Sequence, residues 1–155
     1  TQKCKVTVTK KQAAKKNAKT AGKKNTTSDI SLQKKVISIV NKNRKKKGLE
    51  ALTMDEKLMK AAQDRAKELT KSFSHTRPNG TSCFTIFEKY KITPMASGEN
   101  IAAGQRSAAD VMDSWMNSQG HKENIMNNRF KKIGVGLVIV PNDMYSYYWV
   151  QMFTE

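Results

Sequence analysis

The sequence holds two histidines, His75 and His121, and each lies in a segment rich in glycine, serine and asparagine. A neutral imidazole binds divalent metals, and an imidazole that titrates near neutral pH can act as a general acid or base. His75 stands just before a Pro78-Asn79-Gly80 turn, and His121 directly follows Gly120. These side chains are therefore the first candidates for a site, as metal ligands, as acid–base catalysts or as members of a hydrogen-bonded polar cluster.

Serine and cysteine side chains near the histidines could serve as nucleophiles. Ser74 and Ser118 lie close in sequence to the two histidines, but no serine stands in a Gly-x-Ser-x-Gly pattern. A serine in such a turn is most often a helix cap. A thiolate at Cys83 would be stabilised at the start of a short helix, whereas the alternative is a packing side chain. The sequence favours the structural interpretation for all three residues.

The second cysteine, Cys4, lies near the amino end of the sequence. Two cysteines supply neither a disulfide framework nor the spacing of a zinc knuckle. A Cys4–Cys83 disulfide would form only in an oxidising compartment, and two unpaired thiols are the alternative that the sequence leaves open. No apolar run is long enough to span a membrane. The chain begins at Thr1 without a signal peptide, so we expect a mature or trimmed secreted chain.

Positive charge is concentrated at the amino end. Residues 1–30 hold nine lysines and one acidic residue, which supply +8 of the formal net charge of +16. Few large apolar side chains occur there, so residues 1–29 are predicted to form a disordered, lysine-rich tail before a folded domain of residues 30–155. Such a tail either binds anionic polymers without sequence specificity or serves as a solvated linker. The domain lacks the signatures of specific nucleic-acid binding modules, so no specific nucleic-acid partner is expected.

Apolar residues recur at helical spacing in several segments. The second of these segments opens with Thr53 and Glu56, which are spaced as a capping box, and Ser107 occupies a similar position before a later helix. The predicted helices are Ser31–Lys47, a segment from Thr53 to about Lys71, Phe84–Tyr90, a segment from Ser107 to near Ser118, and one further turn at His121–Met126.

Strand patterns occupy the rest of the domain. The predicted strands are Glu99–Ala103, Ile133–Val140 and Met144–Phe153, with a turn at Pro141-Asn142-Asp143 between the last two. In the last strand the odd-numbered residues from Tyr145 to Phe153 share one face, and Tyr148, Val150 and Met152 share the other. Both faces are apolar, which is typical of a sheet covered on both sides. This order predicts an α+β fold, a three-layer α-β-α sandwich around a small central antiparallel sheet.

Five short motifs together resemble the CAP superfamily, which comprises the cysteine-rich secretory, antigen 5 and pathogenesis-related proteins and is also called the SCP domain. The match is to the bacterial, secreted branch, and it covers about Ile30 to Phe153. The family fold is a three-layer α-β-α sandwich, in agreement with the predicted elements. The motifs are His75–Gly80, Gly98–Gly104, Trp115–His121, Ile133–Gly136 and Tyr148–Phe153.

The resemblance implies a central cleft that contains two histidines and two glutamates. His75 and His121 match the two histidines, and Glu99 matches one glutamate. Ser118 stands where the second glutamate is expected, and Glu123 is a nearby candidate to replace it. The cleft therefore lacks one of the two carboxylates of the family pattern.

The site that follows from the resemblance is a divalent-metal centre. His75 and His121 are its predicted ligands, with Glu99 as a third ligand or general base, and Asn100 and Ser118 are predicted to line the cleft. Three protein ligands leave an open fourth position, as in catalytic zinc sites, and zinc is the metal that the family implies. The alternative is a hydrogen-bonded cluster in which the Glu99 carboxylate orients an imidazole and raises its pKa.

We therefore expect a secreted, extracellular protein, free or at the cell wall, that does not span a membrane. Its cleft would bind a lipid, a peptide or a cell-wall ligand, and residues 1–29 would bind anionic envelope polymers. No cofactor is required for such binding, although the cleft would accept Zn²⁺ or another divalent metal. The alternative is a metal-assisted, peptidase-like hydrolase that uses the same cleft. Ser118 in place of a glutamate favours binding over catalysis.

Overall fold

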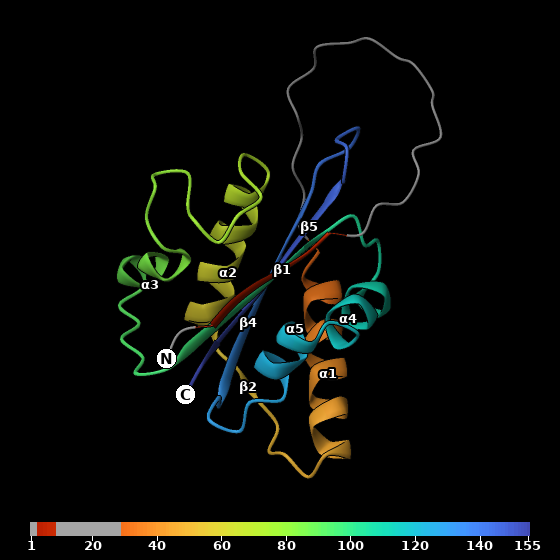
Figure 1. Cartoon of the computed structure of the whole chain (residues 1–155). Helices are drawn as coiled ribbons and strands as arrows, with labels where there is room; N and C mark the ends of the chain where they lie inside the picture. The colour runs from red at the N-terminus through yellow and green to blue at the C-terminus, as the bar shows by residue number, and fades with distance from the viewer. Residues whose placement is uncertain (1–2, 9–28) are drawn as a thin grey trace.

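The computed structural model describes residues 3–8 and 29–155, and side chains from Asp29 onward. In this part of the chain five strands form a single sheet, in the order β1-β3-β5-β4-β2, with helices on both faces (Figure 1). None of the described helices has the length and apolar character that crossing a bilayer requires. The elements are β1 (Lys3–Val8), α1 (Ile30–Lys46), β2 (Thr53–Met54), α2 (Glu56–Leu69), the 3₁₀ turn η1 (Cys83–Thr85), α3 (Ile86–Lys89), β3 (Ser97–Ala103), α4 (Ala108–Met116), α5 (Gln119–Ile125), β4 (Lys132–Ile139) and β5 (Tyr147–Thr154).

The sheet separates two apolar cores. Helices α1, α4 and α5 cover one face, and α2 and α3 cover the other (Figure 1). Trp115, Trp149 and Phe153 are fully buried in the core on the α1 side. Leu58 and Val150 are buried in the core on the α2 side. The predicted α-β-α sandwich is confirmed, but the predicted antiparallel sheet is wrong in part. The sheet is mixed, because the short outer strands β1 and β2 run parallel to β3 and β4.

The three central strands pair as predicted, because β5 lies antiparallel between β3 and β4. Trp149 and Phe153 face the α1 side, whereas Tyr148, Val150 and Met152 face the α2 side, so the predicted alternation is confirmed within β5. Tyr145 differs, since it packs on the α2 side beside Phe73. The reason is local: Ser146, between Tyr145 and the start of β5, has a φ of 61°, so Tyr145 does not continue the extended strand.

The capping box predicted at Thr53 and Glu56 is wrong. Thr53 belongs to the short strand β2, and its main-chain N–H donates to the Lys131 carbonyl at 2.8 Å. Asp55 caps α2 instead, since its Oδ1 accepts from the Leu58 N–H at 2.9 Å. Sheet pairing therefore decided the conformation of Thr53. The cap at Ser107 is confirmed, because its Oγ accepts from the Asp110 N–H at 3.1 Å.

The structure also differs from the predicted disorder at Lys3–Val8. These residues form β1, which runs parallel to β3 with Lys3 opposite Gly98 and Val8 opposite Ala103. Strand pairing uses main-chain groups and needs no large apolar side chains, so composition alone could not reveal it. The remaining residues of the predicted tail, 1–2 and 9–28, lie outside the described residues.

Helix α2 lies directly on β4 because two glycines remove the side chains between them. An added Cβ at Gly134 would overlap main-chain atoms of Leu58, and one at Gly136 would overlap those of Ala62. Val135 between them is buried in the core on the opposite face. The two glycines therefore set the height of α2 above the sheet, and with it the position of every side chain that α2 directs inward.

Replacing Gly136 by alanine is expected to lower the free energy of unfolding by about 3 kcal/mol, because the added methyl group would push α2 away from the sheet. Urea unfolding followed by tryptophan fluorescence measures this loss. The matched control is Gly48→Ala, where φ is +70° but the surrounding space is open, so a loss of about 1 kcal/mol is expected. Equal losses in the two variants would contradict the close approach of α2.

A carboxylate on α2 holds the short helix α3 in place. Asp64 Oδ2 accepts from Lys89 Nζ at 2.5 Å and from the Tyr90 hydroxyl at 2.6 Å. Burial acts to raise the pKa of Asp64, but hydrogen bonds from Lys89, Tyr90 and Lys67 outweigh it and lower the pKa to about 2. The ionised carboxylate therefore stabilises the folded chain.

Asp64→Asn is expected to lower the free energy of unfolding by about 1–2 kcal/mol at pH 6. Because the folded pKa lies below the unfolded value, this contribution is complete above about pH 4 and is lost as the pH falls toward about 2. Urea unfolding of both chains across this range should show their stabilities converging. Glu88→Gln on the exposed face of α3 is the matched control. A difference that persists unchanged at the lowest pH would contradict the assignment.

Candidate functional site

The Glu99 carboxylate is the centre of a polar group buried on the α2 side of the sheet. Arg65 of α2 donates from Nε to Glu99 Oε2 at 2.9 Å and from Nη2 to Oε1 at 3.3 Å, and both side chains are fully buried. His75 Nδ1 lies 2.7 Å from Glu99 Oε1. Three parts of the chain therefore meet at the Glu99 carboxylate. Helix α2 supplies Arg65, the loop after it supplies His75, and β3 supplies Glu99.

A second carboxylate extends this group toward the surface. Arg65 Nη1 donates to Glu68 Oε2 at 2.7 Å, and Arg77 Nη2 donates to Glu68 Oε1 at 2.8 Å. Burial acts to raise the pKa of Glu68, but hydrogen bonds from Arg77 and Arg65 outweigh it and lower the pKa. Burial likewise acts to lower the pKa of Arg65, but the Glu99 and Glu68 carboxylates outweigh it and raise the pKa. Glu99, Arg65, Glu68 and Arg77 thus form a row of alternating charges. Arg65 contacts both carboxylates, whereas Arg77 contacts Glu68 alone.

Cys83 completes the group around Glu99. The loop from Thr76 to Ser82 closes on itself, and the Cys83 N–H donates to the His75 carbonyl at 2.9 Å. The ligand atoms of His75, Cys83 and Glu99 all lie within 4.8 Å of one another. Cys83 is fully buried, whereas the His75 side chain is 18% exposed. We call Glu99, Arg65, His75 and Cys83 the Glu99 cluster.

One imidazole nitrogen of the cluster is buried but makes no hydrogen bond to the described residues. Nε2 of His75 has no hydrogen-bond partner among the described residues. Burying such an atom without a partner costs free energy, so it points to a ligand that completes the site. Imidazole nitrogen and thiolate sulfur are the donors that zinc prefers. Glu99 already accepts from Arg65, and its contact with Nδ1 fixes the tautomer that leaves the lone pair on Nε2. His75 and Cys83 therefore fit a thiophilic divalent metal, with Glu99 as orienting group or third ligand.

The main chain of the other predicted histidine contacts a different polar group. His121 is fully buried in α5, and its carbonyl accepts from Asn100 Nδ2 at 3.1 Å. Asn100 also donates to Gln151 Oε1 at 3.0 Å and accepts from Asn124 Nδ2 at 2.9 Å. Neighbouring residues of a strand point to opposite faces, so Asn100 and Glu99 project to opposite sides of β3. The structure thus brings His75 and Glu99 together and does not include His121 among the metal-ligating side chains around them.

Ser118, which stands where the family pattern has its second glutamate, lies at the beginning of α5. Ser118 is the N-cap residue of α5 and is half-buried. Glu123 is exposed on the same helix and accepts from Gln119 Nε2 at 3.3 Å. Ser74 Oγ accepts from the Thr76 N–H at 3.0 Å, as expected of a serine that stabilises a turn. No second glutamate joins His75, Cys83 and Glu99 in the described metal-ligating group.

Sequence reasoning missed Arg65, and it considered Cys83 as a nucleophile, a disulfide partner or a packing side chain but not as a neighbour of His75. Arg65 carried a usable signal, because it lies on the apolar face of α2 together with Ala61, Ala62 and Leu69. An arginine on such a face needs a buried carboxylate as partner, and Glu99 is the carboxylate that meets it. Cys83 offered no such signal, because its approach to His75 depends on how the loop from Thr76 to Ser82 closes.

The pairing of Cys4 with Cys83 stays a prediction, because the side chain of Cys4 lies outside the described residues. The main chain of Cys4 stands opposite Glu99 in the register of β1 and β3.

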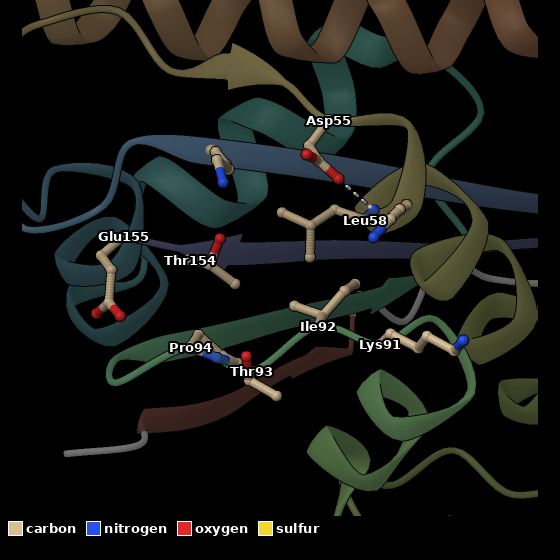
Figure 2. A pocket seen from close by; sticks show the side chains of 10 residues that line it. Asp55, Leu58, Lys91, Ile92, Thr93, Pro94, Thr154 and Glu155 are labelled. Atoms are coloured by element: carbon tan, nitrogen blue, oxygen red, sulfur yellow. Dashed lines mark hydrogen bonds between the residues drawn. The ribbon is translucent and has the colours of Figure 1, made fainter.

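A separate hollow of about 420 Å³ lies at the amino end of α2 (Figure 2). Its lining includes Lys57, Lys91 and Lys132, which are exposed, and it shares no residue with the Glu99 cluster. The Asp55 carboxylate in its wall already caps α2 at Leu58. Exposed lysines in an open hollow are common on a basic surface, whereas the Glu99 cluster gathers buried polar groups. The cluster is therefore the stronger candidate site.

Arg65→Met is expected to destabilise the domain by about 3–5 kcal/mol, because it leaves the Glu99 carboxylate buried without its cation. The double variant Arg65→Met/Glu99→Leu should recover most of this loss, since no unpaired charge remains. Arg77→Met is the matched control and should cost about 1 kcal/mol, because Arg77 pairs with the partly exposed Glu68. Urea unfolding compares the variants, and a double variant no more stable than Arg65→Met would contradict the pairing.

Known proteins share both the sequence pattern and the fold of this chain. It is 39% identical to YkwD of Bacillus subtilis over 126 residues, which make up 77% of this chain and 49% of YkwD, so the chain spans about half the length of that relative. The structure resembles an extracellular SCP-domain protein of Bacillus anthracis, with a TM-score of 0.72 and 25% identity over 81% of this chain and 41% of the other. It also resembles an outer surface protein of Borrelia burgdorferi, with a TM-score of 0.77 and 26% identity over 86% of this chain and 98% of the other. Because residues 37–153 match the cysteine-rich secretory protein (CAP) family, the chain belongs to that family.

Proposed function

We propose that this chain is a secreted binding module whose ligand site is the Glu99 cluster, with a divalent metal such as zinc held at His75 and Cys83. Two observations carry the proposal: Nε2 of His75 is buried without a hydrogen-bond partner among the described residues, and the ligand atoms of His75, Cys83 and Glu99 lie within 4.8 Å of one another. Secretion is supported by the structural relatives from Bacillus anthracis and Borrelia burgdorferi, which are named as extracellular and outer surface proteins.

Each side chain of the cluster has a distinct part in this proposal. Nε2 of His75 and Sγ of Cys83 would hold the metal, and Glu99 would accept from Nδ1–H of His75 and keep the ring in place. Arg65 donates to both Glu99 oxygens and to the Ser74 carbonyl at 2.8 Å, so it fixes the carboxylate and the loop that carries His75. A bound metal supplies an open coordination position for an oxygen or nitrogen atom of a ligand.

The same contacts favour binding over hydrolysis. A general base must be free to accept a proton from water, but the Glu99 carboxylate already accepts from a fully buried arginine. The described metal-ligating group contains no second carboxylate that could act as the general base in place of Glu99. A charge-driven attachment to anionic envelope polymers through residues 1–29 remains part of the proposal, and it rests on the lysine content of that segment alone.

Calorimetric titration of zinc into the reduced full chain tests the metal site. His75→Ala and Cys83→Ser are each expected to weaken zinc binding by more than about tenfold, because each removes one of the protein ligands. The matched control is His121→Ala, which should leave the affinity unchanged. Cobalt in place of zinc gives a second readout, since a thiolate ligand adds a charge-transfer band that Cys83→Ser should abolish.

Two outcomes would contradict this assignment. If the wild-type chain gave no heat of binding when zinc was added, the metal would no longer be part of the proposed function. A loss of affinity in His121→Ala with full affinity in Cys83→Ser would assign the metal to the histidine pair. Circular dichroism of each variant separates loss of the site from loss of the fold.

A further inference from the structure

One edge of β3 is filled by a strand that comes from far away in the sequence. β3 pairs with β5 on one side and with β1 on the other, and β1 is itself the edge of the sheet. Twenty residues, 9–28, separate the end of β1 from Asp29, and β3 begins only at Ser97.

The place that β1 occupies runs along the strand of the candidate site. Cys4 stands opposite Glu99, and the register continues to Val8 opposite Ala103 (Figure 1, β1 in red beside β3 in green). Every residue of β3 is buried when β1 is in place. A segment that lies on this edge thus passes beside the residue that holds His75 and Arg65.

The chemistry of the edge selects the class of partner. A strand edge offers a row of main-chain N–H and C=O groups, and these are satisfied by the main chain of another extended segment. Helix α5 also contacts β1, so this helix on the α1 side of the sheet adds a second surface against which the segment packs. Main-chain pairing suits a polypeptide and cannot be reproduced by a lipid or a glycan. Lys3–Val8 alternates lysine or threonine with cysteine or valine, and its threonine and two valines favour strands.

We infer that the edge of β3 is a docking site for an extended polypeptide, which adds as a parallel strand where residues 3–8 lie in this structure. The inference rests on the proposed function in taking the Glu99 cluster as the binding site, and it deepens that function by naming the ligand class. Lys3–Val8 acts as an internal occupant that an external peptide must displace. A tethered segment competes at an effective concentration on the order of millimolar, so free peptide binds the intact chain weakly.

Fluorescence anisotropy of a labelled peptide tests this inference on the full chain. The probe has the sequence of residues 1–10 with Cys4→Ser, so that no disulfide forms. Val6→Pro in the full chain fixes φ near about −65°, away from the extended value of a parallel strand, and removes a main-chain N–H. It should therefore release β1, which is expected to tighten peptide binding by at least about tenfold. Val6→Ile keeps the strand and should bind as weakly as the wild type. A peptide carrying Val6→Pro itself should not bind either chain.

The opposite results overturn the inference. Absence of peptide binding to the folded Val6→Pro chain would exclude a strand-accepting edge, and equal binding to the wild type and to Val6→Pro would exclude Lys3–Val8 as the occupant. If Val6→Pro does not fold, the wild-type chain is used instead and is incubated with a photo-reactive form of the peptide at about millimolar concentration. Cross-links to β3 or α5 support the inference, and cross-links confined to other elements overturn it.

Zinc titration of the same Val6→Pro chain keeps the two proposals apart. Zinc binding without peptide binding overturns the docking edge and leaves the metal site in place. Peptide binding without zinc binding supports the docking edge, and it removes the metal from the proposed function.

Discussion

The buried ion pair between Arg65 and Glu99 is the interaction on which the rest of the site depends. Removing two charges from water costs several kcal/mol per ion, and only close, well-directed hydrogen bonds offset that cost. Arg65 meets this requirement by donating to both Glu99 oxygens. The geometry is available because Gly134 and Gly136 let α2 descend onto β4. The close approach of α2 to β4 thus supports the position from which Arg65 reaches Glu99 on β3.

The two faces of β3 hold two separate polar groups, and this separation changes what the histidines can do. Glu99 faces α2 and gathers His75 and Cys83. Asn100 faces the other way and binds the main chain of α5 at His121. The family pattern treats both histidines as members of one cleft. In this chain the ligand atoms of His75, Cys83 and Glu99 lie within 4.8 Å of one another, and the metal site that we propose rests on this group.

Much of the scaffold could be predicted from local patterns. Periodicity indicated the main helices, and the apolar run at Ile133–Val140 indicated the central strand β4. The Ser107 cap and the alternation of Tyr148 and Trp149 across β5 are likewise local signals. Each of these depends on residues close in sequence, so the pattern carries the information that the structure uses. The parts that escaped prediction depend on contacts between distant segments. Thr53 joined β4 instead of capping α2, and Lys3–Val8 joined β3 although their composition resembles a solvated tail. Cys83 entered the site only through the closure of a loop.

The site that we propose for this chain is built around His75, Cys83 and Glu99 on the α2 side of β3. Anomalous diffraction at the zinc absorption edge, from crystals of the reduced full chain grown with zinc, tests it most directly. We predict an anomalous peak bonded to His75 Nε2 and Cys83 Sγ, at the zinc–nitrogen and zinc–sulfur distances of about 2.0 and 2.3 Å. A peak bonded to His121 and remote from Cys83 would contradict it.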